Sequence, residues 1–164
     1  MKKHFITKSA RETKKLGKLL AKKLLREPAN WQIVALQGEL GSGKTTFTQG
    51  LLQGLGIKGP YTSPTFLVIK NYKKEFLISK SQFPNKFQSA DWRTKFKILN
   101  IYHIDAYRVT AKDILNLGWK EIVSDKNNII IIEWADRIRK IIPRRARWIR
   151  FQWMDKNKRE IIII

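Results

Sequence analysis

Cysteine is absent from the 164 residues of this chain, and histidine occurs only twice. The first absence excludes a disulfide framework, a thiolate zinc site and a cysteine nucleophile, and the second leaves little material for a histidine metal cage. No apolar run approaches the roughly 18 to 20 residues that a membrane span needs. Residues 1–5 lack the apolar core of a signal peptide. We therefore expect a soluble, cytoplasmic protein without membrane association.

Acidic residues are also scarce, since 13 Asp and Glu stand against 34 Lys and Arg, and the formal net charge is +21. Such a field attracts polyanions and speeds encounter with them, but it does not identify one. Because Lys, Ile and Asn are all abundant, as AT-rich coding would produce, coding bias explains part of the charge. RNA, DNA and acidic proteins all remain candidate partners. The hydrophobic content of 43% meanwhile predicts a folded core.

The apolar spacing predicts helices that alternate with strands. A first helix begins near Ser9, whose spacing to Glu12 is that of a capping box, and ends at Pro28. Its predicted apolar face carries Leu16, Leu19, Leu20 and Leu24. Further helices are predicted from residue 45 to Gly56 and at 113–117, and strands at 31–36, 66–69, 98–104, 129–132 and 147–153. This order predicts one α/β domain over residues 1–164, a three-layer sandwich with a largely parallel central sheet and some antiparallel strands.

Residues 38–45 match the nucleotide-binding pattern G-x-x-x-x-G-K-[ST] in full. Glycines let such a loop curl so that its backbone N–H groups face phosphate oxygens, and the following helix adds its positive end. The lysine reaches the β- and γ-phosphates, and the final hydroxyl is offered to Mg²⁺. A predicted strand precedes the motif and a predicted helix follows it, as the pattern requires. The predicted nucleotide contacts are Gly38, Leu40, Gly41, Ser42, Gly43, Lys44, Thr45 and Thr46.

Hydrolysis requires acidic groups as well as a phosphate cradle. Glu133 ends the isoleucine run of residues 129–132, which is the placement of the acid that holds Mg²⁺, although Asp is more usual there. Asp105 follows the predicted strand 98–104, and the carboxyl ends of strands face the ligand crevice in an open α/β sheet. We therefore predict that Glu133 and Asp105 are catalytic and that they hold the metal together with Thr45. For either acid alone, a surface carboxylate or a helix cap is the alternative.

Four motifs occur in order along the chain: GELGSGKTTF at residues 38–47, SPTF at 63–66, YHIDAYR at 102–108, and EW at 133–134 after an apolar strand. Taken alone, the second is only a turn before a strand. The ordered set resembles the TsaE (YjeE) family, the bacterial P-loop ATPases of tRNA threonylcarbamoyladenosine synthesis, over about residues 7–153.

The resemblance implies a P-loop NTPase-like fold and hydrolysis of ATP with Mg²⁺. It also implies an accessory role beside homologues of TsaD and TsaB, which modify the adenosine next to the anticodon in tRNAs that read codons beginning with A. The residues carried over by position are Ser63 and Thr65 as a nucleotide-sensing switch, Trp134 and Arg108 beside the site, and Ala10 and Lys158 near the nucleoside. A core aromatic is the alternative for Trp134, and packing of its motif against the sheet is the alternative for Arg108. We expect weak intrinsic hydrolysis, because a partner can supply a missing cation.

Residues 73–97 depart from the family pattern and are interpreted as a basic, aromatic-rich insertion into a normally short hairpin. One hypothesis is contact with tRNA or a partner, because cations neutralise phosphates and aromatics stack on bases. The other is a solvated loop whose aromatics pack on their own domain. Two further function classes remain open. The net charge favours a nucleic-acid-binding P-loop module with little hydrolysis, whereas the lack of an arginine-rich lid disfavours a small-molecule kinase.

Overall fold

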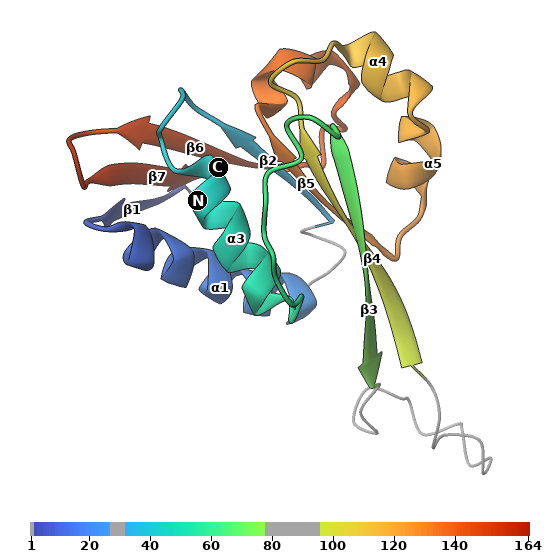
Figure 1. Ribbon diagram of the computed structural model, residues 1–164, viewed down its shortest axis with the longest axis horizontal. Helices are drawn as coiled ribbons and strands as arrows, with labels where there is room; N and C mark the ends of the chain where they lie inside the picture. Colours follow the sequence, from blue (N-terminus) through green and yellow to red (C-terminus); the bar gives the residue numbers. More distant parts are fainter. Residues whose placement is uncertain (1, 27–31, 78–95) are drawn as a thin grey trace.

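The computed structural model describes residues 2–26, 32–77 and 96–164, which form a seven-stranded sheet with helices around it (Figure 1). The strand order is β1-β7-β6-β2-β5-β4-β3. Along the chain the elements are β1 (Lys3–Thr7), α1 (Ala10–Arg26), β2 (Ile33–Gln37), α3 (Lys44–Gly54), β3 (Ile69–Leu77), β4 (Phe96–Asp105), α4 (Ala111–Asn116), α5 (Trp119–Ser124), β5 (Asn128–Glu133), the 3₁₀ helix η3 (Ala135–Ile141), β6 (Arg147–Trp153) and β7 (Arg159–Ile163).

The centre of the sheet is parallel and its margins are antiparallel. β6, β2, β5 and β4 run in one direction, whereas β3 pairs antiparallel with β4, β7 with β6, and β1 with β7. The parallel strands end at the same level, because Glu133 pairs with Leu36 on one side and with Asp105 on the other. The predicted α/β sandwich with a largely parallel centre is confirmed, and the carboxyl ends of its strands bring the candidate acids together.

Each face of the sheet carries its own core. Val34 and Leu36 of β2 pack in the cluster that contains the buried leucines of α1 and α3, while Ile33 and Ala35 face the cluster with α4, α5 and η3. Figure 1 shows α1 and α3 on the side of the sheet opposite α4 and α5. Burial on both faces explains why β2 and β5 have continuous apolar sequences without the alternation of a half-exposed strand.

Helices α1 and α3 pack backbone against backbone through three glycines, Gly17, Gly50 and Gly54. A Cβ on Gly50 would lie 2.1 Å from the carbonyl oxygen of Lys14, and one on Gly17 would lie 2.4 Å from that of Phe47. Any larger residue would force the helices apart, since such separations are far below van der Waals contact. Because α3 directly follows the glycine-rich loop, this packing fixes the start of α1 beside that loop.

The start of α1 was predicted correctly, but Leu19 was wrongly placed on the buried face of this helix. Ser9 Oγ accepts a hydrogen bond from the Glu12 amide at 3.1 Å, and the Glu12 carboxylate accepts one from the Lys8 amide at 2.7 Å. The side chain of Leu19 is 53% exposed, whereas Leu20 is buried. Pro28 and Trp31, which were predicted to end the helix and to begin a strand, lie outside the described residues.

The prediction of a strand at residues 66–69 is wrong. The amides of Leu67 and Val68 both donate to the Pro64 carbonyl, at 2.9 and 2.6 Å, so this segment is a turn. Val68 has φ 63°, a left-handed conformation that is costly for a β-branched residue. Phe66 and Leu67 are therefore exposed, and the strand begins only at Ile69.

Most of the predicted insertion at residues 73–97 lies outside the described part of the chain. Its ends belong to the long antiparallel pair β3–β4, in which Leu77 pairs with Phe96. The hypothesis that it contacts tRNA or a partner stays a prediction. Across residues 2–26, 32–77 and 96–164, no helix has the length and apolarity needed to span a bilayer.

Candidate functional site

The loop of residues 38–43 joins β2 to α3 at the carboxyl edge of the parallel strands. Gly43 precedes the helix with φ 100°, a conformation that favours glycine, and no described side chain caps the first turn of α3. Because the first backbone N–H groups of an α-helix have no intrahelical acceptors, those of α3 are left without a side-chain acceptor among the described residues. Ser42 Oγ is buried and has no hydrogen-bond partner among the described residues. Free donors at a helix N-terminus favour an anionic group such as phosphate.

Lys44 lies inside this loop. Its ammonium donates to the carbonyl oxygens of Gly38 and Glu39 at 2.7 and 2.8 Å, and lies 3.6 Å from the ring centroid of Trp134. Burial lowers the pKa of Lys44, while the negative charges of Glu133, Asp136 and Asp105 act to raise it. The structure thus places Trp134 against the lysine, where a half-buried indole covers one side of the ammonium.

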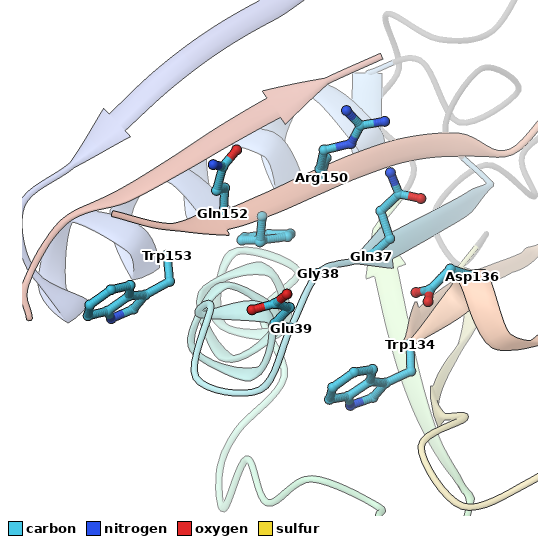
Figure 2. A pocket seen from close by; sticks show the side chains of 9 residues that line it. Gln37, Gly38, Glu39, Trp134, Asp136, Arg150, Gln152 and Trp153 are labelled. Atoms are coloured by element: carbon cyan, nitrogen blue, oxygen red, sulfur yellow. The ribbon is translucent and has the colours of Figure 1, made fainter. Parts of the chain in front are cut away.

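A cavity of about 500 Å³ lies beside the loop and is lined in part by Glu39 (Figure 2). Its walls come from the loop, the start of η3 and the outer end of β6, and its lining residues are Gln37, Gly38, Glu39, Trp134, Asp136, Arg150, Phe151, Gln152 and Trp153. Trp134, which covers the Lys44 ammonium, is therefore also a wall of this cavity.

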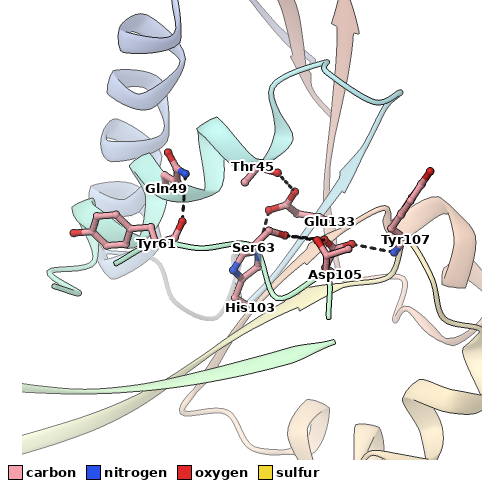
Figure 3. Close-up of polar contacts among 9 residues, drawn as sticks. Thr45, Gln49, Tyr61, Ser63, His103, Asp105, Tyr107 and Glu133 are labelled. Carbon is pink, nitrogen blue, oxygen red and sulfur yellow. Dashed lines mark hydrogen bonds and ion pairs between the residues drawn. The ribbon is translucent and has the colours of Figure 1, made fainter. Parts of the chain in front are cut away.

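Glu133 connects the start of α3 to the interior of the sheet (Figure 3). One carboxylate oxygen, Oε2, accepts the Thr45 hydroxyl at 2.6 Å, and the other, Oε1, lies 2.9 Å from His103 Nε2. The side chains of Glu133 and His103 are only 1% and 2% exposed. His103 was missed as a site residue. The available signal was its spacing of two from Asp105, which places both on the same face of β4.

Asp105 has a different set of partners from Glu133. Its Oδ2 accepts the hydroxyls of Ser63 and Thr65 at 2.7 and 2.6 Å, and its Oδ1 accepts the Tyr107 amide at 3.0 Å. The two predicted acids are adjacent in the sheet, but Glu133 binds the start of α3, whereas Asp105 holds the 63–65 segment (Figure 3). The predicted switch residues are therefore tied directly to a predicted catalytic acid.

Replacement of Asp105 by asparagine is expected to loosen the 63–68 segment. An amide accepts only through its oxygen, so at least one of the three donors that face Asp105 would lose its acceptor. We expect the free energy of unfolding to fall by about 1–3 kcal/mol. We also expect faster hydrogen exchange at the amides of Leu67 and Val68, measured by NMR.

The matched control is Asp136→Asn, because Asp136 is exposed and near the same site. Its free energy of unfolding should stay within about 0.5 kcal/mol of the parent value. Unchanged exchange at both amides in the Asp105 variant would show that this carboxylate does not hold the turn.

A smaller cavity, of about 150 Å³, lies between the start of α1, the glycine-rich loop and the turn before β7. Ala10, Gly43 and Thr46 line it, as do Asn157 and Arg159. The Arg159 Nε–H donates to the Gly41 carbonyl at 3.0 Å, which ties β7 to the loop.

Lys158, which was expected near the nucleoside, does not line this cavity. Its ammonium lies 3.1 Å from the Asp155 carboxylate. The adjacent residues Asn157 and Arg159 line the cavity instead. Leu40 is 78% exposed at the tip of the loop.

The TsaE family model, described as threonylcarbamoyl adenosine biosynthesis protein TsaE, matches residues 7–161. The chain belongs to this family. It is 30% identical over 159 residues to the tRNA threonylcarbamoyladenosine biosynthesis protein TsaE of Treponema pallidum (strain Nichols), covering 96% of this chain and 97% of that protein. It is 31% identical over 155 residues to the protein of the same name from Bacillus subtilis (strain 168), covering 94% and 80%. The crystal structure of Bacillus subtilis YdiB superposes with a TM-score of 0.66 at 26% identity, covering 99% of this chain and 84% of that one.

The TsaE assignment confirms the resemblance carried by the four motifs and places the chain in a family of tRNA threonylcarbamoyladenosine biosynthesis. For Arg108, a residue of the third TsaE motif, the structure speaks against the alternative of packing against the sheet. Arg108 is exposed and its guanidinium carbon lies 5.0 Å from the ring centroid of Phe66, so it contacts the exposed turn and is not packed against the sheet. Tyr107 of the same motif was not predicted as a site residue, yet its ring lies 4.8 Å from that of Trp134.

Proposed function

We propose that this TsaE-family protein is a cytoplasmic ATPase that binds ATP with Mg²⁺ and acts as an accessory subunit beside homologues of TsaD and TsaB. In this proposal it supports threonylcarbamoylation of the adenosine next to the anticodon in tRNAs that read codons beginning with A. The observation that carries the proposal is the meeting of Lys44, Thr45 and Glu133 where the glycine-rich loop becomes α3.

The loop offers phosphate oxygens several donors. An ammonium has three protons, and Lys44 gives two of them to the loop carbonyls, so one remains for a phosphate oxygen. The uncapped amides at the start of α3 and the buried Ser42 hydroxyl add further donors. The half-buried Trp134 excludes water from one side of the ammonium, which strengthens the attraction between Lys44 and a phosphate.

Thr45 and Glu133 fit a magnesium ion held together with phosphates. The Thr45 proton is donated to Glu133, so the lone pairs of the hydroxyl remain for a cation. Within the described ranges no three His, Cys, Asp or Glu side chains form a metal cage. Mg²⁺ does not need one, because it binds through one or two protein groups, waters and phosphate oxygens. When bound, Mg²⁺ neutralises charge on the transferred phosphate.

Asp105 and the smaller cavity complete the proposed site. We assign Asp105 to hold Ser63 and Thr65 where their hydroxyls can respond to the γ-phosphate, in addition to its predicted contribution at the metal. The nucleoside is assigned to the 150 Å³ cavity beside Ala10, which borders the loop at Gly41 and Gly43. Intrinsic hydrolysis should be weak, because Arg108 contacts Phe66 and Lys44 is left as the main cation for the phosphates.

The test is multiple-turnover threonylcarbamoylation of tRNA by TsaD and TsaB, with ATP hydrolysis followed in the same reactions. Wild-type protein should stimulate both, Glu133→Ala should stimulate neither, and Glu75→Gln, a change on exposed β3 surface, should match wild type. Equal modification with and without the protein, under conditions where the pair is active, would refute the accessory role. Salt-sensitive RNA binding that ignores nucleotide would then favour the nucleic-acid module, and ATP use that requires a small-molecule acceptor would favour a kinase.

A further inference from the structure

His103 is buried, and among the described residues its side chain has one polar contact, with Glu133. It lies on β4 opposite Ile131 of β5, and its side chain is 2% exposed. Its Nε2 lies 2.9 Å from Glu133 Oε1, while its Nδ1 is buried without a hydrogen-bond partner among the described residues. Within the described part of the chain, the one hydrogen bond of this buried imidazole is to the carboxylate that also binds Thr45, so the ring is placed to orient that carboxylate.

The two ring nitrogens indicate which tautomer is present. A proton on Nδ1 would be a buried donor without an acceptor, which is costly, whereas a bare Nδ1 is only an unused acceptor. The neutral ring with its proton on Nε2 therefore fits this environment, and it donates to the Glu133 carboxylate. Glu133 then accepts one hydrogen bond on each oxygen, from His103 on Oε1 and from Thr45 on Oε2.

The hydrogen bond between His103 and Glu133 bears on how Glu133 is placed relative to the positive charge of Lys44. The negative charge of Glu133 acts on the pKa of Lys44, yet the described ion pairs include none between these two residues. A glutamate released from His103 would be free to turn toward that ammonium. Such a turn would withdraw the acceptor from Thr45 and occupy the proton of Lys44 that is left for phosphate.

We propose that His103 is a positioning residue that fixes Glu133 toward Thr45 and away from Lys44. Its hydrogen bond commits the Thr45 proton to Glu133, which leaves the hydroxyl lone pairs for a cation and the lysine for phosphate. This inference rests on the proposed function for its catalytic consequence. The pairing of His103 with Glu133 can be tested without any nucleotide.

The test compares His103→Gln, which retains an amide donor at similar reach, with His103→Leu, which does not, and with Ile131→Val as a packing control on the neighbouring strand. ADP affinity is measured by calorimetry with and without Mg²⁺, and ATP turnover is measured beside TsaD and TsaB. In His103→Leu we expect the affinity gained from Mg²⁺ and kcat to fall about 10- to 100-fold. Affinity for ADP without Mg²⁺ should also fall, but by less than the loss of about 100-fold expected for Lys44→Ala, because Glu133 would then compete with phosphate for one proton of Lys44. His103→Gln should recover most of the loss, and Ile131→Val should resemble wild type.

A full magnesium effect and normal kcat in His103→Leu would overturn the proposal. So would equal losses in the Gln and Leu variants, since these would reflect packing alone. The ¹⁵N spectrum of the imidazole in the nucleotide-free wild type decides the pairing separately. We expect a protonated Nε2, a bare Nδ1, and a changed Nε2 signal in Glu133→Gln. If wild type bound no nucleotide, the proposed function would fail, and an unchanged imidazole signal in Glu133→Gln would still overturn the pairing.

Discussion

Replacement of Lys44 by alanine is expected to weaken binding of ATP and ADP at least about 100-fold while the chain still folds. The ammonium is the charged donor inside the loop, and a charged hydrogen bond contributes more than a neutral one. A hundredfold loss corresponds to about 2.7 kcal/mol, which is within the range for loss of one charged contact. Isothermal titration calorimetry with each nucleotide provides the measurement.

The folded state should tolerate this change. Burial already disfavours the charged form of Lys44, as its lowered pKa indicates, so removing the ammonium relieves that cost while leaving the Gly38 and Glu39 carbonyls without their donor. Lys58→Ala, which removes an exposed lysine, is the control for the loss of one positive charge. If the Lys44 variant bound ATP within threefold of wild type, the glycine-rich loop would not be the phosphate site.

Replacement of Glu133 by glutamine should separate binding from turnover. The amide oxygen can accept from only one of the two groups that donate to the Glu133 carboxylate, Thr45 and His103, but the donors to phosphate are unchanged, so we expect nucleotide affinity without Mg²⁺ to remain within about threefold. The negative charge beside Thr45 is lost, and we expect kcat for ATP hydrolysis in the presence of TsaD and TsaB to fall about 100-fold or more. Single-turnover kinetics with the protein in excess over ATP measure the chemical step without the contribution of product release.

Asp136→Asn is the matched control for this experiment, because Asp136 also acts on the charge of Lys44 but is exposed. If both variants lost turnover equally, the effect would be a general change in the field around Lys44. Normal hydrolysis by Glu133→Gln would move the catalytic assignment to Asp105.

Elements defined by local pattern were predictable from the sequence. β2 and β5 have continuous apolar runs because both faces of the sheet are covered, and the glycine-rich motif is a local sequence that forms a local loop. β1 was not predicted, since its residues are mostly exposed and it is a strand only because β7 pairs with it. The apolar run at 66–69 indicated a buried strand, but in the structure these residues form a turn in which Phe66 and Leu67 are exposed.

The same distinction applies to the site. Lys44 and Thr45 follow from the motif itself, but the partners of Glu133 depend on the register between β4 and β5 and on where α3 begins, which no local pattern specifies. Asp105 illustrates the limit further. Its position after an apolar strand indicated a functional acid, yet only the fold shows that it accepts hydrogen bonds from Ser63 and Thr65, 42 and 40 residues away.

The pairing of β1 with β7 also has a consequence for synthesis on the ribosome. Lys3 pairs with Ile163, and the cavity beside Ala10 is closed by Arg159, which bonds to Gly41 across 118 residues of sequence. The glycine-rich loop and its helix are translated well before Lys156, Asn157 and Arg159, which form one wall of the cavity. A nascent or truncated chain that stops before Lys156 therefore lacks that wall, so occupancy of the cavity would report that translation had reached β7.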